Sequence, residues 1–543
     1  MEKPVEELRN ELKRLGYLNR GIERWFALDP WSSRTFWGEL LTLALKAATL
    51  LAVFATLPMV AITVMRNAPL PLYDAVVLSA VYLAGTFLTF VALIILTGLL
   101  LKLSPGLIVD RPRVLLPISV VMSLMIAVAL GVWWAGFDQS IVLTEALTGA
   151  VLILLFFIVS TFIFSAALLS FSIHETGRIP SLHQRRRTIP LTATGILLLA
   201  ATLFPAWSAQ RRDLSGPPPQ VVVSPSSAKL VLLAVDGLSA QIFEARSDLA
   251  GLLASRRTFP PEPYHSSAER WASIGTGTPP EIHGVETIDG VRIAGSRRMI
   301  QSISRTDIYL YGPAAWTGLV QREALPPTIR RRDYVWEILA ERGVSAVAIN
   351  WWASETTTAP NLLILGQEAV FREAATKKGP QRVASALDAI ALKKLTESLR
   401  ARAPRFGTAY LPALDITLNR LESDEGGRLA ASVVILDRLT NEVRALRSLG
   451  YDVMLIGVPG DNQGGAAVLA ASVSLAAAKS TYDLAPTLCV LFGFPPSREM
   501  PGDSPAGESS DRIATYGSRD RRSHSAPVDE EYYEQLKSLG YIQ

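Results

Sequence analysis

The chain has 543 residues, of which 49% are hydrophobic, with a single cysteine and a formal net charge of only +4. One cysteine excludes an intrachain disulfide framework, and the small net charge excludes the strongly basic surface expected of a nucleic-acid-binding protein. The length predicts several domains, and because the apolar residues are concentrated before residue 210, the first of these is expected to lie in a membrane.

Five apolar stretches before residue 210 are long enough to cross a bilayer as helices. A charged segment, residues 1–36, precedes the first of them, so no cleavable signal peptide is expected. The predicted spans are residues 37–65, 75–102, 114–137, 146–173 and 189–209.

Basic residues alternate between the predicted loops and therefore indicate the orientation. The N-terminal segment, the second loop and the fourth loop are basic, whereas the first loop has only Arg66 and the third has no lysine or arginine. Arg211 and Arg212 oppose this pattern but are outnumbered across the fifth span by Arg185 to Arg187. The sequence predicts a multi-pass protein of a bacterial-type inner (plasma) membrane, with a cytoplasmic N-terminus and a periplasmic C-terminal domain.

Residues 210–227 are proline-rich and predict a semi-extended linker, so the predicted regions are 1–36, 37–209, 210–227 and 228–543. The last region alternates strand and helix patterns, which predicts an α/β fold with a mostly parallel sheet and functional groups at the C-terminal strand ends. The expected strands are Leu230–Val235, Ala346–Asn350, Thr408–Leu411 and Val453–Val458. The expected helices are Tyr334–Arg342, Leu429–Leu449 and Leu484–Phe492, the last with Asp483 as N-cap.

The most informative motif begins where the first of these strands ends, at Asp236-Gly237. About thirty residues later comes Ser266-Ser267-Ala268-Glu269-Arg270-Trp271-Ala272-Ser273-Ile274-Gly275-Thr276-Gly277, followed by Pro279-Pro280-Glu281-Ile282-His283-Gly284-Val285. A carboxylate at a strand end and a hydroxyl on a small-residue turn could hold a metal ion against a nucleophile.

These residues, together with Trp336-Glu337-Ile338-Leu339, Ile349-Asn350-Trp351-Trp352 and Tyr482-Asp483-Leu484-Ala485-Pro486-Thr487, resemble the alkaline phosphatase superfamily. The similarity is to the type I phosphodiesterase/nucleotide pyrophosphatase branch and covers most of residues 228–505. It implies two metal ions, usually zinc, held by Asp and His, with a Ser or Thr as the nucleophile. The layout of membrane spans followed by such a domain also resembles bacterial lipid-headgroup transferases.

The resemblance implies that Asp236 is the first metal ligand, Ser267 the nucleophile and Asp415 a further ligand. The chain departs from the family where Asp415 should be followed, four residues later, by histidine, because Asn419 stands there. The proline that commonly follows the nucleophile is Ala268 here.

The family's later Asp-His-Gly should follow the strand at 453–457. An ungapped register places Val458 and Pro459 on the Asp and His, and a register shifted by three residues places Asp461 and Asn462 there. Neither register supplies a histidine, so the candidate metal ligands are Asp236, Asp415, Asn419 and Asp461. After residue 210 the only histidines are His265, His283 and His524, too few for the family's two-zinc site.

Three hypotheses follow from these residues. The first is a degenerate domain without catalysis and without a cofactor, which acts in binding or as a subunit of an envelope protein complex. The second is a site of oxygen ligands for a single hard cation, Mg²⁺ or Ca²⁺, with Ser267 as the nucleophile of a phosphodiesterase, phosphatase or lipid-headgroup transferase. The third is an ordinary zinc phosphodiesterase with ligands elsewhere. The expected partner in every case is the lipid bilayer, with no nucleic acid, and no substrate is identified.

Overall fold

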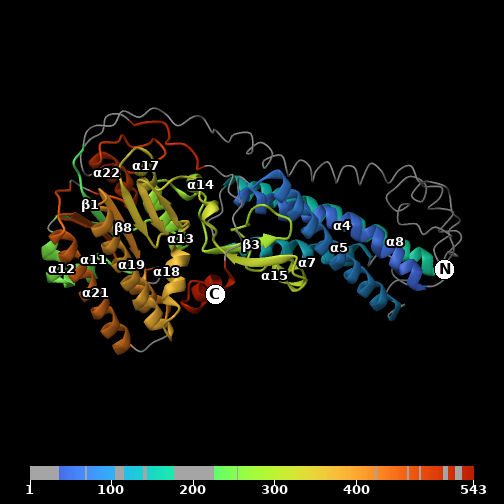
Figure 1. Ribbon diagram of the computed structural model, residues 1–543. Helices are drawn as coiled ribbons and strands as arrows, with labels where there is room; N and C mark the ends of the chain where they lie inside the picture. Colours follow the sequence, from blue (N-terminus) through green and yellow to red (C-terminus); the bar gives the residue numbers. More distant parts are fainter. Residues whose placement is uncertain are drawn as a thin grey trace. The chain divides into compact units, whose positions relative to one another are not determined.

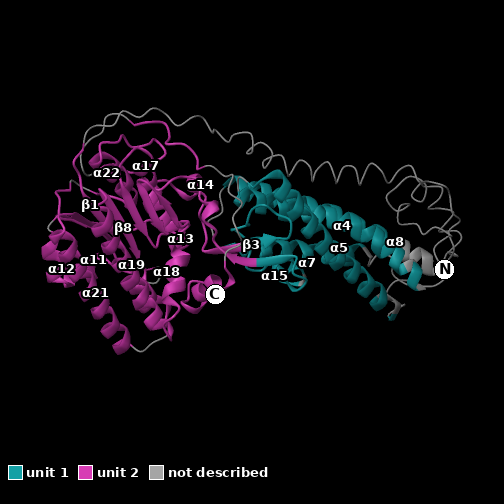
Figure 2. Ribbon diagram, in the orientation of Figure 1, with its two compact units in different colours: residues 1–213, 291–321 teal, residues 214–290, 322–543 magenta. Residues whose placement is uncertain are grey.

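The structure is a computed structural model that divides into two compact units. Figure 2 colours them separately: unit 1 comprises Met1–Asp213 and Val291–Gln321, and unit 2 comprises Leu214–Gly290 and Arg322–Gln543. The residues described are 36–67, 70–103, 115–137, 143–176, 226–253, 255–421, 425–460, 464–475, 478–504, 512–519 and 529–542.

Unit 1 is built on four apolar helices that are long enough to cross a membrane (Figure 1). They are α4 (Phe36–Arg66), α5 (Leu72–Leu103), α7 (Leu115–Ala135) and α8 (Leu143–Thr176). Their bounds confirm the first four predicted spans to within a few residues, except that α8 begins and ends about one turn outside its predicted span. The fifth predicted span, 189–209, lies outside the described residues, as does the N-terminal segment.

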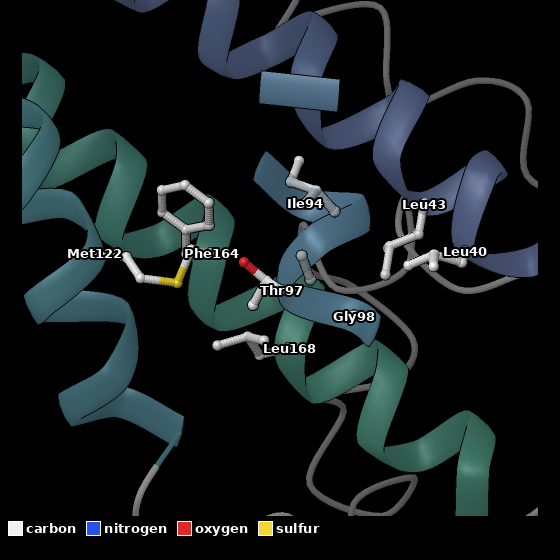
Figure 3. Close-up of a pocket in the computed structure, with 9 residues that line it drawn as sticks. Leu40, Leu43, Ile94, Thr97, Gly98, Met122, Phe164 and Leu168 are labelled. Atoms are coloured by element: carbon white, nitrogen blue, oxygen red, sulfur yellow. The ribbon is translucent and has the colours of Figure 1, made fainter. Parts of the chain in front are cut away.

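The four helices enclose a small apolar pocket (Figure 3). The hydroxyl of Thr97 donates to the Leu93 carbonyl at 2.7 Å within its own helix, so the polar group of the lining is already used. A pocket of this character suits an apolar chain and has no basis for recognising a phosphate. Its lining residues are Leu40, Leu43, Ile94, Thr97, Gly98, Met122, Phe164, Ala167 and Leu168.

Unit 1 also contains Val291–Gln321, here called the docked segment, which leaves the C-terminal domain's chain and packs on the helix ends. The side-chain amide of Asn67 binds the docked segment through both its oxygen and its nitrogen. Oδ1 accepts from the backbone N–H of Gln301 (2.8 Å) and Ser302 (2.9 Å), and Nδ2 donates to the Ser302 carbonyl (2.8 Å). The carboxylate of Asp74, near the start of α5, accepts from the backbone N–H of Arg297 and Arg298 at 2.8 and 3.1 Å.

The deepest anchor of the docked segment is Asp307, which is 1% exposed. One carboxylate oxygen accepts from the Tyr82 hydroxyl on α5 (2.7 Å) and from Nε1 of Trp133 on α7 (2.8 Å). The other accepts from the backbone N–H groups of Tyr309 and Leu310, so Asp307 also caps the short helix α15 (Ile308–Tyr311). A single carboxylate thus joins two of the long apolar helices to a turn that comes more than 170 residues later in the chain.

Unit 2 contains an eight-stranded sheet in the order β2-β10-β9-β1-β8-β5-β7-β6. The central pairings β9-β1, β1-β8, β8-β5 and β5-β7 are parallel, whereas β2, β10 and β6 pair antiparallel at the edges. Every residue of β1 is buried, as expected of a central strand covered on both faces. The strands are β1 (Leu230–Asp236), β2 (Ser255–Phe259), β5 (Ala346–Ile349), β6 (Thr357–Ala359), β7 (Leu362–Leu365), β8 (Phe406–Leu411), β9 (Asp452–Val458) and β10 (Ala467–Ala471).

The helices of unit 2 cover this sheet, with α19 on β5 and β8, α21 on β9 and α17 on β5. A separate two-stranded sheet, β3 (Asp289–Ile293) with β4 (Val320–Ala324), forms the base of the docked segment. The main helices are α11 (Ala240–Ala245), α12 (Ser247–Leu252), α13 (Ser267–Thr276), α14 (Pro280–His283), α17 (Val335–Glu341), α18 (Gln367–Ala374), α19 (Pro380–Arg402), α20 (Ala413–Asp415), α21 (Glu425–Ser448), α22 (Leu484–Leu491) and α23 (Glu530–Ser538).

The four strands and three helices expected from the sequence are all present, and the mostly parallel α/β fold is confirmed. Asp483 is the N-cap residue of α22, as expected, but its side chain makes no capping hydrogen bond to that helix. Its carboxylate accepts instead from the backbone N–H groups of Lys479 (2.7 Å), Ser480 (3.2 Å) and Asp503 (2.8 Å). A short 3-10 turn, Thr481–Asp483, precedes α22, so Asp483 closes that turn and ties in a distant loop.

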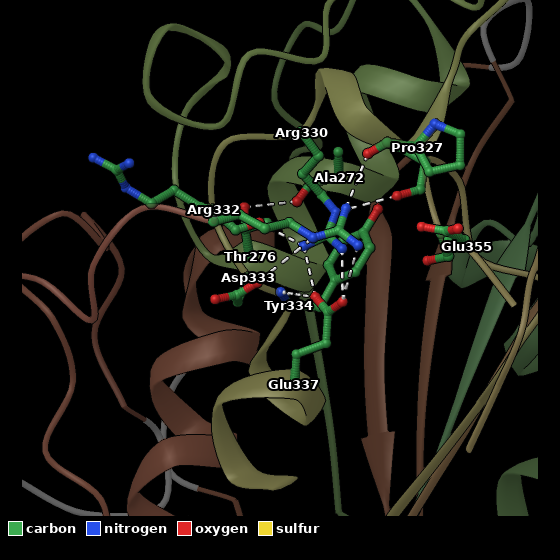
Figure 4. A network of polar contacts seen from close by, with 12 residues as sticks. Ala272, Thr276, Pro327, Arg330, Arg332, Asp333, Tyr334, Glu337 and Glu355 are labelled. Carbon is green, nitrogen blue, oxygen red and sulfur yellow. Dashed lines mark hydrogen bonds and ion pairs between the residues drawn. The ribbon is translucent and has the colours of Figure 1, made fainter. Parts of the chain in front are cut away.

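A buried ion pair fixes the N-terminus of α17 (Figure 4). Arg330 is 1% exposed and its guanidinium pairs with Glu337 at 2.6 Å while lying 3.9 Å above the Tyr334 ring. Glu337 also accepts from the backbone N–H of Tyr334 at 2.7 Å. Since both charges are neutralised within this network, it is a structural element of the domain.

Candidate functional site

The candidate site lies where three neighbouring strands end. Asp236 is the last residue of β1, and it is level with Val458 of β9; its neighbour Val235 is level with Leu411 of β8. Carboxyl ends of parallel strands form the usual binding edge of an open α/β sheet. The chain following each of these strands therefore converges on Asp236.

Asp236 is fully buried and bound by two side chains that the sequence did not single out. The Tyr410 hydroxyl donates to Oδ2 at 2.9 Å, and Nη1 of Arg270 lies 3.3 Å from Oδ1. Burial, and then the negative charge of Asp415, raise the pKa of Asp236 to about 6, while the arginines Arg270 and Arg420 act in the opposite direction.

Helix α13 presents Ser267 and Arg270 to this carboxylate. Ser266 is its N-cap, with Oγ accepting from the backbone N–H of Glu269 at 3.0 Å, and Ser267 is the first helical residue. Residues three apart share a helix face, so the spacing of Ser267 and Arg270 brings the hydroxyl and the guanidinium to the same side. Ser267 is 0% exposed.

Asp415 and Asn419 come from the turn after β8. This turn consists of α20 and a π-helical segment, Ile416–Arg420, in which residues five apart are hydrogen-bonded neighbours. Asn419 Nδ2 donates to Asp415 Oδ1 at 2.7 Å, and Arg420 Nε donates to Asp415 Oδ2 at 2.6 Å. The π geometry thus places both an amide and a guanidinium on one carboxylate.

Arg420 is the residue that links the two halves of the site. Its Nη2 donates to the Ser267 hydroxyl at 2.9 Å while its Nε binds Asp415, and the guanidinium lies 4.3 Å above the ring of Tyr541. The Tyr541 hydroxyl is 3.4 Å from that of Tyr410, the residue that binds Asp236. One continuous set of contacts therefore joins Asp236, Ser267 and Asp415.

In the described part of the chain, the third strand, β9, and the residues up to Gly460 contribute backbone to the site but no side-chain ligand atom. A Cβ added at Gly460 would lie 2.0 Å from Asn419 Nδ2 and 2.2 Å from Asp415 Oδ1, so the chain after β9 passes directly over this pair. Val458 and Pro459, which precede it, have no side-chain donor or acceptor. Asp461, with Asn462, lies outside the described residues.

Of the predicted site residues, the structure thus brings Asp236, Ser267, Asp415 and Asn419 together. Sequence reasoning missed Arg270, Arg420, Tyr410 and Tyr541, although Arg270 stands inside the motif and Arg420 directly follows Asn419.

The described residues at these strand ends do not supply the ligands of the two-zinc site that the family resemblance implies. Within the described ranges no group of three or more His, Cys, Asp or Glu side chains is placed to hold a metal ion. Both carboxylates already face guanidinium groups, with Arg270 on Asp236 and Arg420 on Asp415. Two negative and two positive charges balance without a cation.

His283, in the site motif, is used structurally. Its Nδ1 accepts from the backbone N–H of Val285 at 3.1 Å, so Nε2 carries the proton and donates to Ser273 at 2.8 Å. Burial, with Arg330 and Arg331 nearby, lowers the pKa of His283 to about 3, so the ring stays neutral.

A buried carboxyl behind the site gives a pH-dependent prediction. Asp388 on α19 accepts from the backbone N–H of Ala413, and burial raises the pKa of its carboxyl to about 7. Between pH 4 and 7 the folded chain holds a proton that the unfolded chain has released, so stability falls as pH rises, by about 1.4 kcal/mol per pH unit for one such group.

Asp388→Asn, measured by thermal unfolding of the detergent-solubilised chain, should therefore be more stable than the wild type at pH 8 and equal to it at pH 4. Asp248→Asn is the matched control, because that carboxylate is surface-exposed and its pKa lies below the window. Equal pH profiles for wild type and Asp388→Asn would contradict the assignment.

Part of the chain is similar to known proteins. Residues 230–447 match the family model described as type I phosphodiesterase / nucleotide pyrophosphatase. The chain carries an alkaline phosphatase-superfamily, phosphodiesterase-like domain. No curated protein matches the chain.

Solved structures similar to the chain are distant. A phosphonoacetate hydrolase from Sinorhizobium meliloti is 14% identical with a TM-score of 0.31, covering 45% of this chain and 60% of its own. Human ectonucleotide pyrophosphatase / phosphodiesterase 5 is 14% identical with a TM-score of 0.29, covering 42% of this chain and 56% of its own. A putative sulfatase from Bacteroides thetaiotaomicron is 12% identical with a TM-score of 0.33, covering 53% and 76%. The chain spans about 60% of the hydrolase's length.

Proposed function

We propose that the alkaline-phosphatase-like domain is catalytically silent and that two arginines have replaced metal ions as the partners of its carboxylates. The observation that carries this proposal is the position of Arg420, which binds Asp415 at 2.6 Å and Ser267 at 2.9 Å at the same time. In an active relative of this superfamily, the nucleophile and a carboxylate share a metal ion instead.

The chemistry of arginine explains why this arrangement is unsuited to catalysis. A serine hydroxyl becomes a nucleophile when a base or a metal removes its proton. A guanidinium is always protonated and has no acceptor atom, so Arg420 can donate to Ser267 but cannot deprotonate it. Asp415, the carboxylate that Arg420 joins to Ser267, is itself bound by Arg420 and Asn419.

A silent, folded domain attached to membrane helices suits a role in binding, as a subunit or scaffold of an envelope protein complex. The domain keeps its sheet and its phosphodiesterase-like strand ends. Its function would then be to bind another protein through its surface. The protein partner would be identified by its co-purification with the intact chain.

The helix ends that hold the docked segment support the orientation that we propose for the chain. Asn67 follows α4, Asp74 begins α5 and Trp133 ends α7, so the docked segment lies at the side that the charge pattern makes external. α8 has 34 residues, about 51 Å, and so ends at the opposite side. The chain must return before β1, and we assign that fifth crossing to residues 189–209, in a bacterial inner membrane with the domain periplasmic.

The catalytic proposal is tested on the purified full chain by metal analysis and by hydrolysis of a chromogenic phosphate diester, with and without Zn²⁺, Mg²⁺ or Ca²⁺. We expect substoichiometric metal and no turnover above that of Ser267→Ala. Stoichiometric zinc with turnover abolished in Ser267→Ala would overturn the proposal.

A second function is a site for one hard cation, which would use the carboxylate of Asp415 and the amide oxygen of Asn419; the Asn419 amide, whose Nδ2 now donates to Asp415 Oδ1 at 2.7 Å, would have to turn. In that case Arg420 would have to move, and activity would need Mg²⁺ or Ca²⁺ and be lost in Asp415→Ala. Asp236, Ser267 and Asp461 would complete that site.

A further inference from the structure

The docked segment carries three large apolar side chains that are exposed in the described part of the chain: Ile308, Trp316 and Leu319, the last 53% exposed. Ile308 is 64% exposed and Trp316, at the end of α16 (Pro313–Trp316), is 85% exposed. Ile308 directly follows Asp307, the buried anchor, so its position is fixed by the docking, and Trp316 follows at the end of the next short helix. Leaving such side chains in water is unfavourable by about 25 cal/mol per Å².

The contacts of Asp307 set the height of this turn along the bundle. α7 has 21 residues, about 31 Å, which matches the hydrocarbon thickness of a bilayer. Trp133 lies within its last turn, so the level of Trp133 marks the outer boundary of the hydrocarbon. Asp307 binds Trp133 and Tyr82 and therefore lies at that boundary.

Tyr309, two residues after Asp307, extends further along the helix bundle. The Tyr309 ring packs edge-on against Tyr82 at 6.4 Å, and its Cδ1 would lie 2.5 Å from a Cβ added at Gly85, almost one turn along α5 towards the membrane centre. A larger residue at Gly85 would push Tyr309 away. The α15 turn thus lies alongside α5, at and just below the boundary.

The surface around the turn continues the lipid-facing side of the bundle. On α5, Leu88 is 66% exposed, close in sequence to the Tyr82–Gly85 contact with α15. Tryptophan is enriched at membrane interfaces, where its apolar ring and its polar N–H are both accommodated. Ile308 and Trp316 therefore suit the same lipid environment as Leu88.

The charge of the docked segment fits the headgroups above this surface. It contains four arginines and one acidic residue, Asp307, which is buried, so its net charge is +3. Basic residues at this height are attracted to anionic lipid headgroups. The arginines are Arg292, Arg297, Arg298 and Arg305.

We propose that the turn Asp307–Trp316 is a membrane-interface element that enters the outer leaflet, with Ile308 against acyl chains and Trp316 among the headgroups. The partner is the bilayer that the four helices cross, and the proposal rests on that crossing. The domain's chain is then tethered to the lipid surface in its middle as well as through its N-terminal linker.

The test places single cysteines at Ile308, Trp316, Leu88 and Ala294 of the full chain for spin labelling in anionic vesicles. Cys489 is buried, and burial raises the pKa of its thiol to about 12, so the parent chain should remain unlabelled. Ala294 is an exposed residue of the same docked segment near the start of α5, and Leu88 is the lipid-facing reference.

Labels at 308 and 88 should be relaxed by oxygen several-fold more than by a water-soluble nickel chelate, and the label at 294 should show the reverse. Trp316→Cys should be intermediate. If the label at 308 is as accessible to nickel as that at 294 while Leu88 stays lipid-facing, the interface element is refuted and the membrane anchor stands.

A label at 308 shielded from both reagents would indicate a protein covering, which also overturns the proposal. Nickel accessibility at Leu88 itself would refute the membrane crossing, and the interface element with it. Gel filtration of each labelled chain establishes that it is folded.

Discussion

Arg420→Ala should destabilise the alkaline-phosphatase-like domain by about 3–5 kcal/mol, the usual cost of removing one partner of a buried ion pair. Asp415 is 0% exposed, and without the guanidinium it keeps only the Asn419 amide as a side-chain donor. The Ser267 hydroxyl loses its donor in the same variant. The effect is measured as a fall in the unfolding midpoint of the detergent-solubilised chain.

Two further variants separate the reasons for this loss. Arg420→Lys keeps the positive charge, but its single ammonium group cannot bind Asp415 and Ser267 in the two-pronged geometry of a guanidinium. We therefore expect an unfolding midpoint between those of Arg420→Ala and the wild type. Arg420→Ala with Asp415→Asn removes the uncompensated charge and should recover more than Arg420→Lys does. A wild-type midpoint in Arg420→Ala would contradict the role assigned to this arginine, and a midpoint restored by Mg²⁺ in that variant would support the hard-cation alternative.

Asp307→Ala should release the docked segment from the helices. The variant loses four hydrogen bonds and leaves the buried Tyr82 hydroxyl and Trp133 Nε1 without their acceptor. Each hydrogen bond to a charged group contributes about 1.5–3 kcal/mol, so the loss is large even if the contributions are not additive. Limited proteolysis of the full chain should show faster cleavage within residues 291–321.

Asp307→Asn tests the carboxylate itself, because an amide nitrogen would face the Trp133 N–H, donor against donor, and so should not restore protection. Thr317→Ala is the matched control in the same segment, since its exposed hydroxyl binds only the Ala314 carbonyl. Unchanged cleavage in Asp307→Ala would show that Asn67 and Asp74 suffice to hold the segment.

The central sheet could be predicted because its strands are continuous apolar runs. β1, β8 and β9 are buried along almost their whole length, and Asp236 is the polar residue that ends the first of them. Gly343 and Gly450, which stop two predicted helices, have φ of +87° and +81°, a conformation that other residues rarely adopt.

The edge strands could not be predicted in the same way. β2 exposes Arg256 and Arg257 at the sheet edge, and β6 has only three residues, so neither carries a buried-strand pattern. Their identity depends on pairing with strands distant in sequence.

The acidic residues and the serine of the site could be predicted from the sequence, but the arginines that neutralise the acidic residues could not. Asp236, Ser267, Asp415 and Asn419 stand at motif positions, whereas Arg270 and Arg420 resemble ordinary helix arginines until the fold brings them to carboxylates 34 and five residues away. The contact of Arg420 also requires a π turn, which the regular helical period does not foresee.

The narrow base of the docked segment has a practical consequence for obtaining a soluble protein. A chain cut before β1 would still carry residues 291–321, and Leu310, Ile300 and Tyr309 would be uncovered without the helices they pack against. Where the segment leaves and returns, the N–H of Ala294 and the carbonyl of Leu319 are only 2.7 Å apart. A two-residue hairpin turn could therefore join these positions directly. In the shortened domain β3 and β4 would be consecutive strands of a hairpin, and the exposed apolar segment that could cause aggregation would be absent.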